Sequence, residues 1–281
     1  MKELNKRLIV SDFDGTLTTS QNEVDEDVRL AINNYVEAGG IFAVCTGRML
    51  VSILPRVRAL GLKGLVIAYQ GSVIAEIESG KIIKNGSLNY FDVAEVCRFI
   101  EGLKRDCKHF KYGINAYYNE ILYTDIPKDN ERLMLYESIT GIDAVKVDIP
   151  ISEFITANKC DCQKIGILVS PDDREELYKK LLNEFGDRFD VTCSAKVLVE
   201  VSPLYDTKGE ALKFIADYYG IPLSSTVAIG DNLNDLSMIE TANVGVAVGN
   251  AAQGLKEAAD AVTVTNNEGA VARIIEKYGY K

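Results

Sequence analysis

The sequence is poor in several features that mark particular classes of protein. Its 281 residues include a single histidine, His109, which lies far in sequence from every motif described below. A Ser-His-Asp or Cys-His catalytic group is therefore not expected, and any general acid or base is expected to be a carboxylate. The six cysteines are scattered and no secretory signal is evident, so reduced thiols are expected.

Basic residues and long apolar runs are also scarce. The 31 lysines and arginines are outnumbered by 41 acidic residues, giving a net charge of -10, which argues against nucleic acid or an anionic membrane as partner. No apolar run reaches the roughly 18 residues that span a bilayer, and a cytoplasmic protein is expected. A small phosphorylated substrate is not excluded, because a magnesium ion and one lysine can reverse the local field. The sequence does not indicate the oligomeric state.

Short strands alternate with helices near both ends of the chain, which predicts βαβ units and a doubly wound, mostly parallel sheet. The expected strands are Leu8–Val10, Ile41–Cys45, Leu65–Ala68, Val227–Ile229, Val244–Val248 and Val262–Val264. The expected helices are Asp25–Ala38, Met49–Leu60, Lys208–Tyr219, Asp231–Glu240, Ala251–Ala259 and Glu268–Tyr278.

The middle of the chain has a different pattern. A hairpin is expected from Gly113–Tyr118 and Ile121–Tyr123, and helices are expected near 92–105, 129–138 and 172–185. Mixed strands and helices of this length predict an α+β domain. The fold class is therefore α/β, with a core of residues 1–84 and 194–281 and an inserted α+β domain of residues 85–193.

The run Asp12-Phe13-Asp14-Gly15-Thr16-Leu17-Thr18 follows the first strand. Residues at i and i+2 of an extended chain point to the same side, so the two carboxylates are crowded. At 4 Å and an effective dielectric near 20 their repulsion is about 4 kcal/mol. A cation between them would offset this cost, and magnesium with a transferring phosphoryl group fits. An acidic, solvated turn is the alternative if the pair is taken alone.

Three further polar segments lie where strands end or helices begin. They are Thr46-Gly47-Arg48, Lys208-Gly209 and Gly230-Asp231-Asn232-Leu233-Asn234-Asp235. Ligands of open α/β sheets bind beyond the carboxyl ends of the strands, so these segments are expected to converge with Asp12 and Asp14. Taken alone, each segment also has a purely structural explanation, such as a turn, an exposed lysine or a helix cap.

In this order and at these distances, the four segments resemble the motifs of the haloacid dehalogenase (HAD) superfamily, and more closely the Cof-type phosphatases with a large α/β cap of type IIB. The resemblance implies a magnesium-dependent phosphatase acting on small phosphomonoesters through an aspartyl-phosphate. It implies Asp12 as the nucleophile and Asp14 as the acid and base. The implied phosphate-binding residues are Phe13, Thr46, Gly47, Lys208 and Asn234. Magnesium is implied to be bound by Asp12, the backbone carbonyl of Asp14, and Asp231, with Asp235 supporting the metal or Lys208 from outside the direct ligands.

Two features leave the reaction and the substrate open. Gln70 stands where the family usually has asparagine, which puts substrate contacts there in doubt. The cap is expected to set leaving-group specificity, with Tyr112, Tyr117, Tyr118 and Tyr123 as candidates, although strand packing is their more common role. Sugar phosphates, nucleotides and cofactor phosphates all fit. A phosphomutase and a non-catalytic phospholigand-binding protein are the alternatives.

Overall fold

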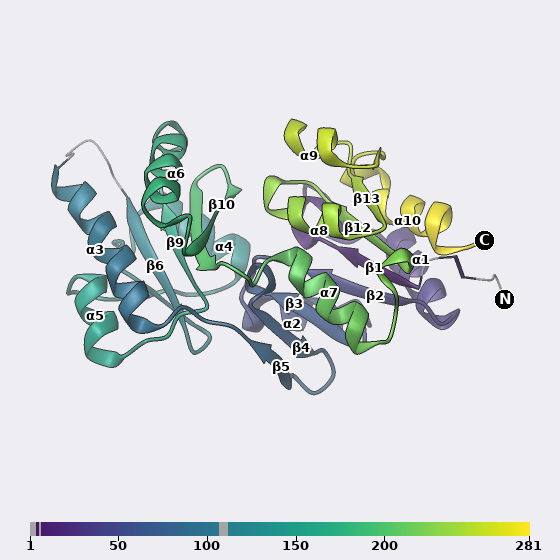
Figure 1. The fold of residues 1–281 in the computed structure, drawn as a ribbon, viewed down its shortest axis with the longest axis horizontal. Coiled ribbons are helices and arrows are strands. Elements are labelled where there is room, and N and C mark those ends of the chain that lie inside the picture. Colours follow the sequence, from purple (N-terminus) through teal and green to yellow (C-terminus); the bar gives the residue numbers. More distant parts are fainter. Residues whose placement is uncertain (1–3, 6, 107–111) are drawn as a thin grey trace. The chain divides into compact units, whose positions relative to one another are not determined.

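The computed structural model describes residues 4–5, 7–106 and 112–281, and the predictions for His109 and Cys107 fall outside these residues. The chain divides into two compact units (Figure 1). The core unit consists of Met1–Lys84 and Asp206–Lys281, and the inserted unit is Asn85–Tyr205. No helix in the described part of the chain is long and apolar enough to cross a membrane.

The core unit is built on an eight-stranded sheet in the order β14-β13-β12-β1-β2-β3-β4-β5. The strands from β14 to β3 are parallel, and β4 pairs antiparallel with β3. Their bounds are β1 Leu8–Ser11, β2 Ile41–Cys45, β3 Leu65–Ala68, β4 Val73–Glu76, β5 Ile82–Asn85, β12 Thr226–Gly230, β13 Val244–Ala247 and β14 Ala261–Val262. The central strands are buried along their whole length, as expected for a parallel sheet covered on both faces.

The helices of the core unit pack in two groups. Helix α1 contacts α10 and the turn η6, whereas α7 contacts α8. In α1 the buried Val28, Ile32 and Tyr35 recur at helical spacing and form its inner face. The bounds are α1 Glu26–Glu37, α2 Leu50–Ala59, α7 Lys208–Tyr218, α8 Leu236–Thr241, α9 Gln253–Ala258, α10 Ala270–Ile274 and η6 Ile275–Gly279. Short helical turns are η1 Phe13–Leu17, η2 Tyr69–Gly71, η3 Leu223–Ser225, η4 Leu233–Asp235 and η5 Asn266–Glu268.

The inserted unit has a six-stranded sheet in the order β10-β11-β9-β6-β7-β8, antiparallel except for the β7–β8 pair. One face carries apolar side chains such as Ile114, Ile165 and Val199 into an apolar core. The strands are β6 Gly113–Tyr118, β7 Ile121–Thr124, β8 Val145–Lys146, β9 Lys164–Leu168, β10 Phe189–Ala195 and β11 Leu198–Pro203. The helices are α3 Tyr90–Asp106, α4 Glu131–Thr140, α5 Ile151–Asn158 and α6 Pro171–Phe185.

The candidate tyrosines of the inserted unit are mostly packing residues. Tyr112 is part of its apolar core, and Tyr118 and Tyr123 pack against that core. Tyr117 lies on the other strand face, where its hydroxyl is 2.7 Å from the hydroxyl of Tyr136.

The predicted fold class, a parallel α/β core with an inserted α+β domain, is confirmed. The boundary between the units differs from the expected one where the chain returns from the inserted unit to the core unit. Residue 193, the expected end of the insertion, lies within β10, and the units divide only after Tyr205. The reason is the antiparallel pairing of β10 with β11, whose register shifts between Thr192 and Ala195, so that a polar stretch resembling a linker is strand. Helix α5 and the β4–β5 extension were not predicted.

Candidate active site

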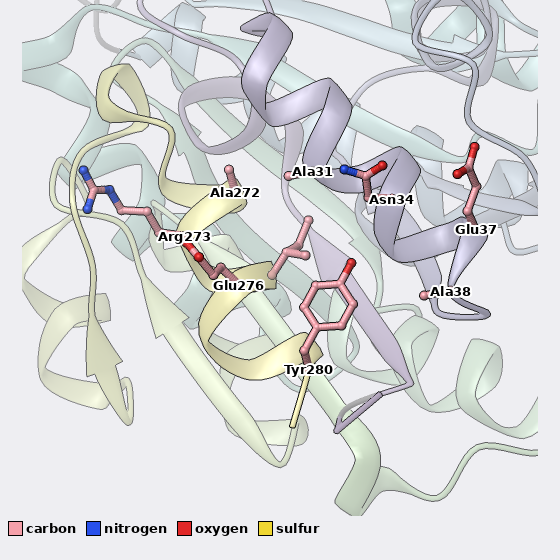
Figure 2. A pocket seen from close by; sticks show the side chains of 9 residues that line it. Ala31, Asn34, Glu37, Ala38, Ala272, Arg273, Glu276 and Tyr280 are labelled. Carbon is pink, nitrogen blue, oxygen red and sulfur yellow. The ribbon is translucent and has the colours of Figure 1, made fainter. Parts of the chain in front are cut away.

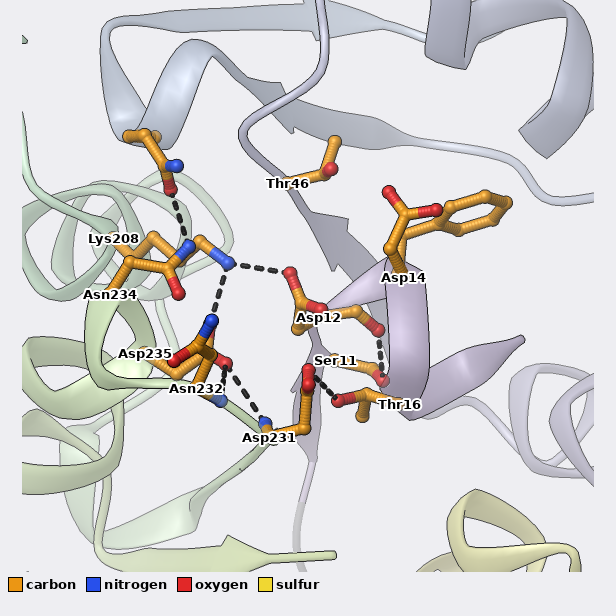
Figure 3. A network of polar contacts seen from close by, with 12 residues as sticks. Ser11, Asp12, Asp14, Thr16, Thr46, Lys208, Asp231, Asn232, Asn234 and Asp235 are labelled. Atoms are coloured by element: carbon orange, nitrogen blue, oxygen red, sulfur yellow. Dashed lines mark hydrogen bonds and ion pairs between the residues drawn. The ribbon is translucent and has the colours of Figure 1, made fainter. Parts of the chain in front are cut away.

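Parallel pairing of two central strands brings the predicted acidic residues together. Strand β1 pairs with β12 so that Ser11 lies opposite Ile229, and both chains turn immediately afterwards. Asp12 and Asp231 therefore leave the sheet side by side at its carboxyl edge, where Lys208 and Asp235 join them (Figure 3). Carboxylate oxygens of Asp12, Asp231 and Asp235 all lie within 4.8 Å of one another.

Lys208 is the centre of this acidic cluster. Its side chain is buried, and Nζ donates to Asp12 Oδ1 and to Asp235 Oδ1 at 2.5 Å each. Burial alone would lower the pKa of this lysine, but the two carboxylates outweigh it and raise the pKa well above the usual range. Lys208 is therefore charged and held in place by two ion pairs.

The loop after β12 supports the cluster through the side chain of Asp235. Asp235 Oδ2 accepts the backbone N–H groups of Asp231 and Asn232 at 2.9 and 3.0 Å, while its other oxygen binds Lys208. Both oxygens of this buried carboxylate thus have partners within the protein. Asp235 is better placed to orient Lys208 and the Asp231 loop than to bind a metal.

Asp231 approaches the turn that follows β1. Its Oδ1 accepts from the Thr16 hydroxyl at 2.9 Å. Gly15 has φ +78°, and a Cβ at this position would lie 2.9 Å from Asp231 Oδ2. Glycine is therefore required twice here, for the left-handed backbone and for the close approach of the carboxylate.

The acidic cluster has the chemistry of a divalent-cation site. Burial raises the pKa of Asp12 well above its usual range, with repulsion from Asp235 and Asp231 adding to the effect and Lys208 opposing it. Burial and Asp235 likewise raise the pKa of Asp231 to about 6. Three carboxylates face one ammonium group, so the cluster has more groups that can carry negative charge than positive charge to balance them. Its donors are all oxygens, which fits magnesium.

The side chain of Asp14 lies apart from this cluster. Both carboxylate oxygens are bound by Arg48, from Nε at 2.7 Å and Nη2 at 2.6 Å. The Arg48 guanidinium is buried, lies 5.7 Å from the centre of the Phe13 ring, and also reaches the Ser52 hydroxyl at 3.3 Å. Such a bidentate pair fixes the orientation of Asp14. Its backbone carbonyl remains only a predicted metal ligand.

The predicted phosphate-binding residues come from different elements of the core unit. Thr46 follows β2, and its backbone N–H donates to Ile67 O at 3.0 Å. Its hydroxyl oxygen accepts from the Arg48 backbone N–H at 3.2 Å, which leaves the hydroxyl proton to donate to a ligand. Asn234 lies in η4, where its Nδ2 donates to Gln70 Oε1 at 3.0 Å. In Figure 3, Asn234 and Lys208 lie to the left, and Thr46, Asp12 and Asp14 lie to the right of them.

Two residues of this site were not given roles from the sequence, Arg48 as the partner of Asp14 and Thr16 as the partner of Asp231. Both stand inside motifs that were recognised, but their partners are 34 and 215 residues away. Only the fold shows these pairings.

A separate pocket of about 580 Å³ lies between α1 and the C-terminal helical segment (Figure 2). Asn34, Glu37, Arg273, Glu276 and Tyr280 are among its lining residues. It includes no residue of the acidic cluster and is distinct from the candidate active site.

Comparison with known proteins agrees with the site. The family model of haloacid dehalogenase-like hydrolases matches residues 9–275. A Haemophilus influenzae protein that carries the provisional name of phosphatase is 30% identical over 96% of this chain and 97% of its own. A Bacillus subtilis 5-amino-6-(5-phospho-D-ribitylamino)uracil phosphatase is 28% identical, over 96% of this chain and 97% of its own.

The fold is also shared with solved structures. A haloacid dehalogenase-like hydrolase of B. subtilis superposes with a TM-score of 0.84 and 27% identity, covering 96% of this chain and 99% of the other. The chain belongs to the haloacid dehalogenase-like hydrolases and is an enzyme of that class. The resemblance stated from the four motifs is thereby confirmed.

Proposed function

We propose that this enzyme is a magnesium-dependent phosphatase that hydrolyses small phosphomonoesters through a phosphoryl group carried on Asp12. The observation that carries the proposal is the buried Lys208, bonded to both Asp12 and Asp235 beside Asp231. A lysine and an acidic cation site beside one carboxylate provide what phosphoryl transfer needs, namely positioning and neutralisation of charge.

In the first half-reaction a carboxylate oxygen of Asp12 attacks phosphorus, and the bond from phosphorus to the ester oxygen breaks. Asp14 gives its proton to the departing oxygen, which leaves as an alcohol. In the second half-reaction Asp14 takes a proton from water, and the water oxygen attacks the phosphorus on Asp12. Inorganic phosphate leaves and the Asp12 carboxylate is restored.

The surrounding residues hold these groups in place. Lys208 orients Asp12 and supplies positive charge to the phosphoryl oxygens, together with the Thr46 hydroxyl and the Asn234 amide. Arg48 orients Asp14 through two hydrogen bonds, one or both of which must open when Asp14 carries its proton. Asp12 and Asp231, with the Asp14 carbonyl, would hold magnesium, which supplies charge stabilisation to the transferring group.

The substrate is proposed only as a class. One relative is named for a ribitylaminouracil phosphate, a small phosphomonoester, and such compounds, sugar phosphates and nucleotides form the candidate set. No observation favours a phosphomutase or a non-catalytic binding protein over a hydrolase. A cytoplasmic location and the lack of nucleic-acid or membrane partners stay predictions from the sequence.

The test is phosphate release from a panel of phosphomonoesters with magnesium or with EDTA, for the wild type and Asp12→Asn. The amide keeps the shape of the carboxylate but is not a nucleophile, so kcat should fall by about 10⁴-fold or more. A circular dichroism spectrum and melting temperature close to wild type would show that the variant is folded. Turnover by a folded Asp12→Asn protein, or equal release with EDTA, would contradict the proposal.

A further inference from the structure

The loop after β3 has an unusual backbone. Tyr69 and Gln70 have φ of 51° and 61°, and Gly71 has φ of 121°. Residues other than glycine rarely adopt such left-handed φ values, and two of them adopt these values in succession here. A Cβ on Gly71 would lie 2.4 Å from the carbonyl oxygen of Thr207, so this loop is pressed against the start of α7, directly before Lys208.

This backbone carries the Gln70 side chain between two of the predicted phosphate-binding segments. Gln70 is 3% exposed, and its backbone N–H donates to Thr46 O at 3.0 Å. Its Oε1 accepts from Asn234 Nδ2 at 3.0 Å. On the opposite side its Nε2 lies 2.4 Å from the position that a Cβ of residue 47 would occupy. Gly47 therefore leaves the space that the Gln70 amide fills.

The amide of Asn234 has few other constraints. Its Oδ1 is buried and has no hydrogen-bond partner in the described part of the chain. An amide nitrogen carries two hydrogens, so one can bind Gln70 Oε1 while the other remains for a ligand. Holding Nδ2 from one side thus sets the direction of its second N–H group.

We propose that Gln70 is a positioning residue for phosphoryl binding, which acts by holding the Asn234 amide with one N–H directed at the phosphoryl group. The inference rests on the proposed function in taking Asn234 as a phosphate ligand. The Gln70 side chain is long enough to span from the Gly47 backbone to Asn234.

The first experiment is a double-mutant cycle with Gln70→Met and Asn234→Ala, read as the Kd of inorganic phosphate by calorimetry in magnesium. Methionine keeps the length of glutamine but cannot accept a hydrogen bond. Each single variant should weaken phosphate binding by about tenfold, the usual value of one hydrogen bond. The double variant should bind no more than about twofold more weakly than Asn234→Ala. Ser72→Ala is the control and should bind like the wild type. It removes a buried hydroxyl from the same loop, and among the residues that the structure describes this hydroxyl has no hydrogen-bond partner.

Two results would overturn the proposal. Phosphate binding by Gln70→Met within twofold of wild type would show that Gln70 does not position Asn234. Losses that multiply in the double variant would show that Gln70 acts independently of Asn234. A wild type that binds phosphate with this coupling but releases none from any ester would keep the inference and contradict the proposed phosphatase. If the wild type is an active phosphatase but Gln70 and Asn234 show no coupling, the proposed phosphatase would stand and the inference about Gln70 would be contradicted.

A second measurement applies if Gln70→Met does not fold. Gln70→Asn keeps an amide and a residue type that tolerates left-handed backbone, but it is too short to reach Asn234, so it should lose phosphate affinity to the same extent. Gly47→Ala should lower the melting temperature in the wild-type background and much less in the Gln70→Asn background. Equal losses in both backgrounds would contradict the contact between Gln70 and residue 47.

Discussion

Among the described residues, each unit of this enzyme buries one lysine against carboxylates, and the two arrangements differ in charge balance. In the core unit Lys208 binds both Asp12 and Asp235, with Asp231 beside them. In the inserted unit Lys164 forms an ion pair with the single carboxylate of Glu200 at the sheet and lies 4.7 Å from the centre of the Tyr117 ring. The second pair is neutral as a whole, whereas the first cluster has more negative than positive charge.

The difference separates a structural ion pair from a reactive site. A buried pair of equal and opposite charges needs no further ion. A cluster of buried carboxylates with a single lysine remains incompletely neutralised. Burial raises the pKa of Asp12 and of Asp231, and repulsion from the neighbouring carboxylates adds to this effect. Under the proposed function the core cluster would take up a cation and a phosphoryl group, whereas the pair in the inserted unit needs neither.

The largest expected effect comes from removing each lysine in turn. Lys208→Met should lower kcat/KM by about a thousandfold, since the charge opposite the developing phosphoryl charge is lost. Lys164→Met should leave turnover near wild type but cost about 3–5 kcal/mol of stability, because Glu200 stays buried without its partner. Phosphate release and chemical denaturation followed by circular dichroism measure the two effects.

The double variant Lys164→Met/Glu200→Leu is the control for this comparison. It removes both charges and should recover most of the stability lost in Lys164→Met. If Lys164→Met instead lost turnover at unchanged stability, the pair would belong to substrate binding, and the distinction between the two lysines would be wrong.

An intermediate effect is expected from magnesium itself. If Kd is about 1 mM, 10 mM magnesium stabilises the folded protein by about 1.4 kcal/mol, which corresponds to about 3–5 °C in melting temperature. Because the pKa of Asp231 is raised to about 6, protons compete with the metal below that pH and the shift should shrink. Differential scanning fluorimetry at pH 7.5 and 5 tests this, with Asp231→Asn as the control. An equal shift in that variant would place the metal elsewhere.

The smallest effect concerns Asp190 in the inserted unit. Burial and the nearby Glu200 raise the pKa of Asp190 to about 6. The folded state therefore holds a proton that the unfolded state releases near pH 4, and wild-type stability should fall as pH rises from about 4 through 6. After allowance for its partial exposure the effect is about 1 kcal/mol. In Asp190→Asn this part of the pH dependence should vanish, as denaturation midpoints at pH 4.5 and 7.5 would show. If the denaturation midpoint of Asp190→Asn depended on pH as strongly as that of the wild type, the prediction would be wrong.

Much of the fold could be predicted from local pattern. Strands such as Ile41–Cys45 and Leu65–Ala68 were predicted with the bounds that the structure has, since each is a short apolar run bounded by turn residues. Helix α5 was missed because it has only eight residues and follows directly on Pro150. The exit from the inserted unit was misplaced because strand pairing, and not composition, decides that β10 and β11 belong to its sheet.

The sequence by itself determined the class of the protein, because its four motifs combine residue types, order and strand ends that phosphoryl transfer requires. It placed Asp12, Asp231 and Lys208 at one sheet edge through the topology that the alternating pattern implies. Only the tertiary structure decided which polar group binds which. Arg48 holds Asp14 and Gln70 holds Asn234 across 34 and 164 residues of chain. Such pairings depend on where packing brings side chains together, which local propensity does not encode.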